Sequence, residues 1–311
     1  MRKLFIVSGA TATGKSSLAQ ALASLTSAHI ISIDSMKLYR GMDIGTDKPS
    51  IHIRSRIPHH LIDIVDAYET YDVARYVKEA NTLIERFNNE RVPFLFEGGT
   101  PLFIKALVEG LFDGAPADVS LRRRLYEEAK EKGVETLYKR LKEIDVQSAE
   151  RIHKNDLKRI VRALEVYETV GCPISLLQRQ FGETKQEYFL VVLWRGKEEL
   201  RNRIRARLLR MIEEGFVEEV KRLMERGGLS ATASQAAGYA EIIEYLSGKT
   251  TLVQAMKRIE TRHWQLARRQ MVWLKSFPNA CHICLKGEVN YKVIAEELLS
   301  HYGEGTSLCS L

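Results

Sequence analysis

The sequence predicts an α/β fold, in which a parallel sheet is flanked by helices and a helical insertion interrupts the chain. Short runs rich in β-branched and apolar residues recur, and a glycine-rich loop joins the first run to a helical pattern. A central stretch of charged, helix-favouring residues separates the early runs from the later ones. Strand, loop and helix in that order are typical of the opening unit of a parallel sheet.

The length of 311 residues exceeds the roughly 100 to 200 residues of an ordinary domain, so we expect one large domain that carries an insertion. We place the first part of the core at residues 1–115. The insertion follows at 116–182, and the chain returns to the core at 183–311.

In the first part, residues 3–8 are expected to form a buried strand and residues 15–25 a helix. Two further strands, 29–33 and 92–96, end at Asp34 and at Glu97-Gly98-Gly99. Open α/β sheets bind ligands at the carboxyl edge of their strands, so both ends are candidate site positions.

After the insertion, the β-rich runs 187–194 and 280–285 predict strands, and the amphipathic patterns of 198–226, 240–246 and 252–275 predict helices. The last strand contains Cys281 and Cys284 in a CxxC pair. We interpret it as a strand rather than a metal site, because a second ligand pair is missing. The small, polar tail from Gly303 is expected to fray.

The composition indicates a soluble, cytoplasmic protein with reduced cysteines. No run approaches the roughly 20 apolar residues that span a bilayer, and the apolar run 4–7 is too short for a signal peptide. The four cysteines lack the spacing of a disulfide framework. A formal net charge of +7 and a pI near 9.1 hint at a polyanionic partner and not a membrane.

A phosphate-binding loop follows the first strand and matches G-x-x-x-x-G-K-[ST] at every defined position. Its backbone N–H groups and the helix N-terminus are expected to hold a diphosphate, which Lys15 neutralises. The Ser16 hydroxyl is the candidate ligand for Mg²⁺. The predicted diphosphate site consists of Gly9, Ala10, Thr11, Ala12, Thr13, Gly14, Lys15 and Ser16.

This loop alone does not say which bond is broken. Kinases use it to transfer a terminal phosphoryl group. In another class of enzymes an allylic diphosphate leaves from carbon, and the loop stabilises the departing anion.

Further motifs make the choice specific. Residues 34–46 read DSMKLYRGMDIGT and closely resemble the signature of the tRNA dimethylallyltransferase (isopentenyltransferase) family. The similarity continues in the family's order over nearly the whole chain. It includes Lys48-Pro49, the run HHLID at 59–63, Gly98-Gly99-Thr100, His153-x-Asn155-Asp156, Arg159-x-x-Arg162-Ala163-Leu164-Glu165, Gly215-Phe216, Gly238-Tyr239 and Arg269-Gln270-x-x-Trp273.

The resemblance implies a P-loop NTPase-like sheet and Mg²⁺-dependent transfer of a dimethylallyl group from dimethylallyl diphosphate to N6 of the adenosine on the 3′ side of the tRNA anticodon. The partner would be the anticodon stem–loop, and we expect a monomer. The alternatives are an adenylate isopentenyltransferase that acts on free nucleotides, a small-molecule kinase and an inactive RNA-binding protein. The basic insertion argues against the first, because a mononucleotide needs no such surface.

Three residues are candidates for catalysis. Asp34, at the end of a strand facing the loop, could accept the proton of the weakly nucleophilic adenosine amine. It could instead be a second-shell Mg²⁺ ligand or a helix N-cap, and the resemblance favours the base. Thr100 would lie beside the reacting centre by the resemblance, its alternative being a turn and an N-cap. Arg207 shares a helix face with Arg203 and Arg210, and one of the three is expected to clamp the diphosphate unless the face is only solvated.

The resemblance also assigns tRNA contacts. Around the base they are Asp34, Ser35, Met36, Lys37 and Thr100, and on the insertion they are Arg122, Lys158, Arg159, Ile160, Val161 and Arg162. Sequence physics alone supports only a charged helix face there. The target adenosine must leave its stack to reach a buried carbon centre.

Two departures from the family pattern matter. Lys37 stands where the family usually has Gln. We expect recognition of the base to differ, because lysine cannot accept a hydrogen bond. Trp264 stands where the family carries an arginine, and stacking on RNA is expected to replace one phosphate contact. Ala10, where proline is common, is a mild change.

Overall fold

The computed structural model describes residues 3–110, 118–178, 186–302 and 304–308. The chain divides into two compact units, Met1–Val108 with Gln186–Leu311, and Glu109–Lys185. The first is the core unit and the second the insertion. The boundaries that the sequence predicted, at 115/116 and 182/183, lie outside the described residues.

The core unit is built on a six-stranded parallel sheet with the order β3-β2-β4-β1-β5-β6. The strands are β1 (Leu4–Gly9), β2 (His29–Ser32), β3 (His59–His60), β4 (Phe94–Glu97), β5 (Tyr188–Arg195) and β6 (Cys281–Leu285). All residues of β1 and β4 are buried, as expected for central strands covered on both faces. The predicted fold class is confirmed, and the CxxC pair lies on a strand.

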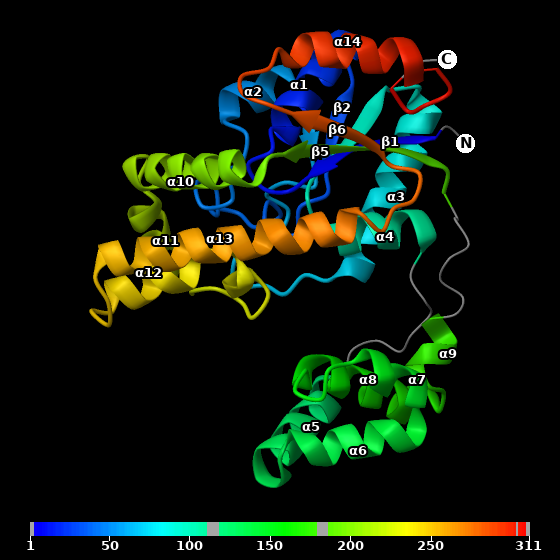
Figure 1. Cartoon of the computed structure of the whole chain (residues 1–311), viewed down its shortest axis with the longest axis vertical. Coiled ribbons are helices and arrows are strands. Elements are labelled where there is room, and N and C mark those ends of the chain that lie inside the picture. Colours follow the sequence, from blue (N-terminus) through cyan, green and yellow to red (C-terminus); the bar gives the residue numbers. More distant parts are fainter. Residues whose placement is uncertain (1–2, 111–117, 179–185, 303, 309–311) are drawn as a thin grey trace. The chain divides into compact units, whose positions relative to one another are not determined.

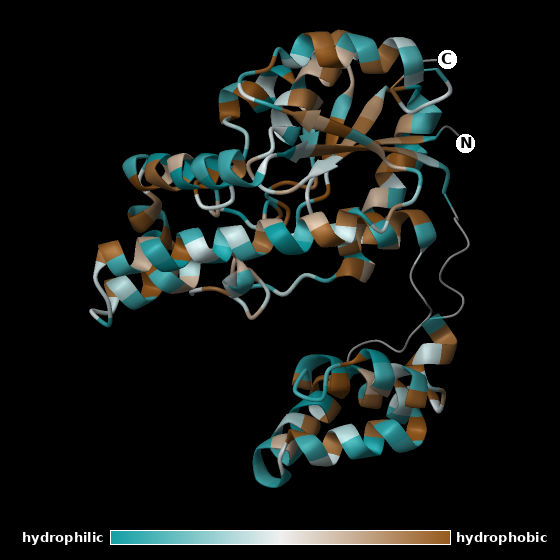
Figure 2. Ribbon diagram, in the orientation of Figure 1, coloured by the Kyte–Doolittle hydropathy of each residue, from teal (hydrophilic) through white to brown (hydrophobic). Residues whose placement is uncertain are grey.

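Helices cover both faces of this sheet (Figure 1). On one face α1 (Lys15–Thr26) and α14 (Tyr291–Tyr302) pack against Phe5 and Val7 of β1. On the other, α3 (Val73–Glu90) and α4 (Pro101–Glu109) share a core with Leu4 and Ile6. Successive side chains of β1 point to opposite faces of the sheet and so belong to two separate hydrophobic cores. Figure 2 shows the sheet as the hydrophobic centre of the unit.

The predicted helix 198–226 is wrong as a single element. It is two helices, α10 (Lys197–Glu213) and α11 (Phe216–Glu225). Gly215 between them has a left-handed backbone with φ 96°, which ends the first helix. The next helices are α12 (Tyr239–Leu246) and α13 (Leu252–Leu274), and α13 begins with a capping box formed by Thr251 and Gln254.

The expectation of a frayed tail is wrong for residues 304–308. The Ser307 hydroxyl accepts the Phe5 N–H, and the Ser307 carbonyl accepts the Phe94 N–H. Thr306, Ser307 and Leu308 are buried. The tail is held because it satisfies backbone donors of two strands, which its polar composition did not reveal.

The insertion is helical, as its composition indicated. Its helices are α5 (Val119–Lys132), α6 (Val134–Ile144), α7 (Val146–Arg151), α8 (Leu157–Val170) and α9 (Ile174–Gln178). They enclose a core of their own, in which Leu125, Leu137, Leu141 and Leu164 are fully buried. Within the described residues of the whole chain, no helix has the length and apolar character needed to cross a bilayer.

Candidate active site

The phosphate-binding loop, residues 9–16, lies between β1 and α1, as predicted. Gly14 has a left-handed backbone with φ 102°, and a Cβ added there would lie 1.9 Å from the Tyr291 hydroxyl oxygen. The position therefore requires glycine. Lys15 is buried, and burial lowers its pKa although the neighbouring Glu97 carboxylate acts in the opposite direction. A helix N-terminus and a buried amine together favour an anion.

Arginines of α10 lie against this loop. Arg203 Nε donates to the Ala12 carbonyl oxygen over 2.8 Å, and Arg207 Nη1 donates to Thr11 Oγ1 over 2.7 Å. They border a cavity of about 460 Å³, here called the P-loop cavity, whose lining residues include Lys15, Ser16, Asp47, Arg203, Arg207 and Arg210. The basic helix face that the sequence indicated thus faces a phosphate-binding loop.

Ser16, the candidate metal ligand, donates its hydroxyl proton to Glu97 Oε1 over 2.9 Å. The other oxygen of Glu97 pairs with Lys37 Nζ at 3.3 Å, and both side chains of this pair are 5% exposed. Burial raises the pKa of Glu97, but the charges of Lys37 and Lys15 and the two hydrogen bonds lower it by more. The pKa of Glu97 therefore lies below its ordinary value, and the side chain is an ionised carboxylate. Because the Ser16 hydroxyl donates its hydrogen to Glu97, the lone pairs of the Ser16 oxygen are available to bind a cation.

Lys37 faces this carboxylate. Burial lowers the pKa of Lys37, but the charges of Glu97, Asp34 and Asp47 outweigh that effect and raise it. Its ammonium therefore contacts the same carboxylate that accepts the hydrogen bond of Ser16 in the P-loop. The sequence predicted Lys37 among the contacts to the base.

Two more cavities continue from the P-loop cavity. A central cavity of about 70 Å³ shares with it Lys15, Ser16, Asp47 and Arg207. A wide cavity of about 610 Å³ shares with the central one Asp34, Met36, Ala236, Ala237, Leu266 and Gln270. The three cavities thus have common walls, and Asp34 stands where the central and wide cavities adjoin.

Asp34 and Thr100 line the wide cavity together, as does Ser35. Asp34 Oδ1 accepts the Met36 N–H over 2.9 Å, and Thr100 Oγ1 accepts the Ser35 N–H over 3.1 Å. Turns follow Asp34, so the alternative of a helix N-cap is wrong for this residue. Thr100 precedes α4, where an N-cap would lie, and its hydroxyl oxygen accepts the N–H of Ser35. This hydrogen bond connects the chain after β2 to the chain after β4.

Gln270 of α13 is a site residue to which the sequence gave no role. Its Oε1 accepts the Thr11 N–H over 2.9 Å, and its Nε2 donates to the Gly99 carbonyl oxygen over 2.6 Å. Gly99 leaves room for this contact, since a Cβ there would lie 2.7 Å from Gln270 Nε2. One buried amide therefore fixes the P-loop relative to the Gly-Gly-Thr segment.

His263 of α13 lines the central cavity beside Arg207. Burial and the charge of Arg207 lower the pKa of His263 to about 3. A neutral imidazole therefore forms part of the wall at ordinary pH. Nothing in the sequence pattern singled it out.

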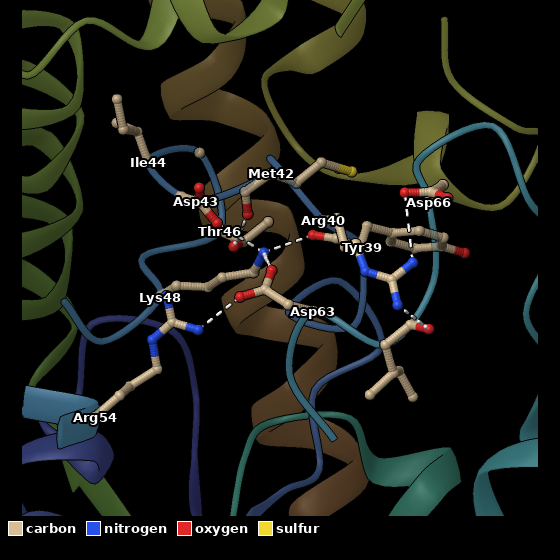
Figure 3. Close-up of polar contacts among 12 residues, drawn as sticks. Tyr39, Arg40, Met42, Asp43, Ile44, Thr46, Lys48, Arg54, Asp63 and Asp66 are labelled. Carbon is tan, nitrogen blue, oxygen red and sulfur yellow. Dashed lines mark hydrogen bonds and ion pairs between the residues drawn. The ribbon is translucent and has the colours of Figure 1, made fainter. Parts of the chain in front are cut away.

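The segment 39–48 includes Asp47, which lines two of these cavities. Polar contacts around the buried Lys48 hold this segment (Figure 3). Lys48 Nζ contacts the Tyr39 carbonyl oxygen, Asp43 Oδ1 and Asp63 Oδ1, and its side chain is 1% exposed. Asp63 Oδ2 in turn accepts from Arg54 Nη1 over 2.6 Å. The network joins two separate sequence matches, because Lys48 and Asp63 are in contact although 14 other residues separate them in the printed sequence.

Trp264 packs inside the core unit. Its ring contacts the cluster formed by Ala10, Leu200, Ile204 and Ala267, and the Arg201 guanidinium carbon lies 4.6 Å from the ring centroid. The Arg201 guanidinium therefore stacks on the Trp264 ring, for which we expected stacking on RNA.

The predicted tRNA contacts of the insertion fall into two groups. Glu165 is fully buried, and its two oxygens pair with Arg122 Nε at 2.8 Å and Arg162 Nη1 at 2.7 Å. Arg159 and Lys158 are exposed, and Arg159 pairs with Asp156 at 2.6 Å. These four cations can meet RNA at the surface of α8 and α5.

Ile160 and Val161 cannot do so with their side chains. They are 0% and 1% exposed and belong to the core of the insertion. Their prediction as tRNA-binding side chains is corrected, because the helical period turns both residues inward from the exposed pair that precedes them.

Comparison with known proteins gives matches over most of the chain. The family model described as IPP transferase matches residues 37–277. A tRNA dimethylallyltransferase of Thermotoga neapolitana is 44% identical over 286 residues, which cover 89% of this chain and 91% of that protein.

Solved structures are similar as well. The full-length tRNA isopentenylpyrophosphate transferase of Bacillus halodurans is 31% identical, with a TM-score of 0.72, and the match covers 98% of this chain and 97% of that one. A eukaryotic dimethylallyltransferase acting on tRNA is 25% identical, with a TM-score of 0.80, and the match covers 98% and 77%. With its P-loop, its Asp34 and Thr100 in one cavity and these matches over most of its length, the chain belongs to the tRNA dimethylallyltransferase family.

Proposed function

We propose that this protein transfers a dimethylallyl group from dimethylallyl diphosphate to N6 of the adenosine on the 3′ side of the tRNA anticodon and releases diphosphate. The observation that carries the proposal is the series of adjoining cavities, which starts at the P-loop and reaches Asp34 and Thr100. The diphosphate would occupy the cationic end and the nucleobase the wide end. The short prenyl chain would lie in the narrow middle against its apolar lining residues, which are Met36, Ala236, Ala237 and Leu266.

At the cationic end, the P-loop amides, Lys15 and Arg207 would hold the diphosphate. Arg207 touches Thr11 of the loop and lines both the P-loop and central cavities, so its guanidinium can follow the anion as the carbon–oxygen bond lengthens. Stabilising charge that develops in the transition state is what accelerates the reaction.

The metal would be Mg²⁺, with the Ser16 oxygen as its protein ligand. Among the described residues no group of three or more His, Cys, Asp and Glu side chains could hold a metal ion, so the other ligands would be diphosphate oxygens and water. The bound ion would neutralise the leaving group. Glu97 fits this arrangement because it accepts a hydrogen bond from the Ser16 hydroxyl and leaves the lone pairs of the Ser16 oxygen available to the ion.

At the wide end, Asp34 would accept the proton from the adenosine amine. Its Oδ1 is oriented by the Met36 N–H, so the carboxylate is fixed before the base arrives. Thr100 and Ser35 would face the base beside it. The amine nitrogen would form a bond to the prenyl carbon and lose a proton to Asp34, so the nitrogen ends without a net charge. The bond from carbon to the diphosphate would break, and the diphosphate would leave toward Lys15.

The exposed Lys158 and Arg159 and the partly buried Arg122 and Arg162 of the insertion would bind phosphates of the anticodon stem–loop. Glu165 fixes two of these guanidinium groups by ion pairs, which lowers the entropy that they lose on binding. We place this reaction in the cytoplasm, where tRNA is modified.

The proposal is tested by incubating the protein with Mg²⁺, dimethylallyl diphosphate and, in separate reactions, tRNA, free AMP or ATP with a small alcohol. Nucleosides and nucleotides are then identified by mass spectrometry. We expect a dimethylallyl group on one adenosine of tRNA and no modification of AMP. Transfer to AMP alone, or a phosphorylated product with no prenylated one, would refute the proposal.

A further inference from the structure

One carboxylate lies among the cations of the P-loop cavity. Of the described residues that line this cavity, Lys15, Arg203, Arg207 and Arg210 are cationic, and Asp47 is the acid. Asp47 Oδ1 accepts from Arg210 Nη2 over 2.8 Å, and Oδ2 lies 3.5 Å from Arg207 Nη1. Asp47 thus occupies two guanidinium groups that would otherwise both be directed at a bound diphosphate.

The chain presents this carboxylate at a cost in backbone strain. Asp47 has a left-handed backbone with φ 54°, a region that non-glycine residues adopt infrequently. Such positions persist where the surrounding structure holds them, and they concentrate at functional sites.

Two buried charges hold the segment that carries Asp47. The Glu219 carboxylate of α11 accepts the N–H groups of Asp43, Ile44 and Gly45 and the Tyr239 hydroxyl proton, over 2.7 to 3.1 Å. Lys48 holds the other end of the segment through the contacts in Figure 3. The direction of the Asp47 side chain is therefore fixed from both sides.

We propose that Asp47 is a built-in counter-anion of the diphosphate pocket, which positions Arg207 and Arg210 and weakens the binding of released diphosphate. The inference rests on the proposed function. A pocket of four cations that lacked this acid would bind the product as well as the transition state. Equal stabilisation of both does not speed chemistry, and it slows release.

The test is direct binding of inorganic pyrophosphate to the full-length protein, measured by titration calorimetry with and without Mg²⁺. The variant is Asp47→Asn, because asparagine tolerates the left-handed backbone and keeps the shape of the side chain. Loss of one charge a few ångströms from the ligand, after screening by water and salt, is expected to tighten Kd by about tenfold. Structural damage would weaken binding, so a gain separates the two explanations.

Asp43→Asn is the matched control. Asp43 belongs to the same segment and loses the same charge, but it is not among the residues that line the P-loop cavity. We expect its pyrophosphate Kd to stay within about twofold of wild type, since its amide oxygen can still accept from Lys48. Arg210→Gln should act in the opposite sense and weaken pyrophosphate binding, because it leaves the charge of Asp47 unbalanced.

Binding by Asp47→Asn that is unchanged or weaker than wild type, in either condition, overturns the inference. Weaker binding only with Mg²⁺ would make Asp47 a metal ligand instead. The proposed function is judged separately, from prenyl transfer by wild type in the same preparation. If wild type transfers the group and only the binding result is negative, the counter-anion role fails and the function stands.

Discussion

Replacement of Gln270 by leucine tests the link between the P-loop and the Gly-Gly-Thr segment. The side-chain amide satisfies the Thr11 N–H and the Gly99 carbonyl oxygen, both in a buried setting. Leucine has a similar volume and no polar atoms. The substitution therefore removes two hydrogen bonds and leaves two backbone groups without their partners.

The magnitude follows from these two groups. A buried donor or acceptor that loses its partner costs about 1–3 kcal/mol. Water entering from the wide cavity, which Gln270 also lines, can replace part of this loss. We therefore expect the free energy of unfolding to fall by about 2–4 kcal/mol. The catalytic efficiency for the prenyl donor should fall as well, because the Thr11 amide belongs to the proposed diphosphate site.

The assay is urea denaturation followed by tryptophan fluorescence. The chain has three tryptophans, Trp194, Trp264 and Trp273, and all lie in the core unit, so the signal reports on the unit that contains the substitution. The control is Gln265→Leu on the same helix, where the glutamine is exposed. Equal stabilities of the two variants, within about 0.5 kcal/mol, would refute the reasoning.

Three further predictions concern other parts of the molecule. Asp34→Ala should lower the rate of prenyl transfer by about 10²-fold or more, since a general base is lost, while pyrophosphate binding stays unchanged; turnover near the wild-type value would remove Asp34 from that role. Lys158→Ala should weaken tRNA binding and lower, by about one, the slope of the logarithm of the association constant against the logarithm of salt concentration. The KM of the donor should not change. Lys249→Ala in the core unit should alter neither tRNA binding nor its salt dependence. Burial, with the neighbouring His29 and Arg86, lowers the pKa of His60 to about 4, below the ordinary 6.5, so the unfolded chain binds more protons between these values and stability falls as the pH drops through this window. Unfolding curves should therefore depend less on pH from 6.5 to 4 in His60→Asn than in wild type or in His52→Asn, and equal slopes would contradict this assignment.

The local parts of the site could be predicted from the sequence. A glycine-rich loop between a strand and a helix has a strong local signature. Thr100 follows β4, which neighbours β1, and Asp34 follows β2, the next strand beyond β4 in the parallel sheet. The structure places these residues around adjoining cavities. Their catalytic and binding roles stay predictions that the variants above test.

The long-range contacts could not be predicted in this way. Gln270 meets Thr11 across 259 residues of sequence, and Glu219 meets Asp43 across 176. No periodic pattern records such pairs, because each depends on how α13 and α11 pack within the folded core unit. Glu97 did carry a signal, since it is an acid at the end of a buried strand next to the Gly-Gly-Thr motif.

The wrong predictions have equally local causes. Gly215 was interpreted as a glycine inside a helix, although its left-handed backbone ends α10. Ile160 and Val161 were assigned with their neighbours as one stretch, although a helix exposes only part of any run of residues. In each case the side-chain directions decide the outcome, and composition does not contain them.

The central claim is that the P-loop holds a leaving diphosphate and not a phosphoryl group in transfer. The most direct measurement compares, in one reaction, the amounts of diphosphate and orthophosphate released with the amount of prenylated adenosine in tRNA. We expect one diphosphate for each modified adenosine and no orthophosphate in the absence of a pyrophosphatase. Release of orthophosphate, or of diphosphate without a modified nucleoside, would contradict the account.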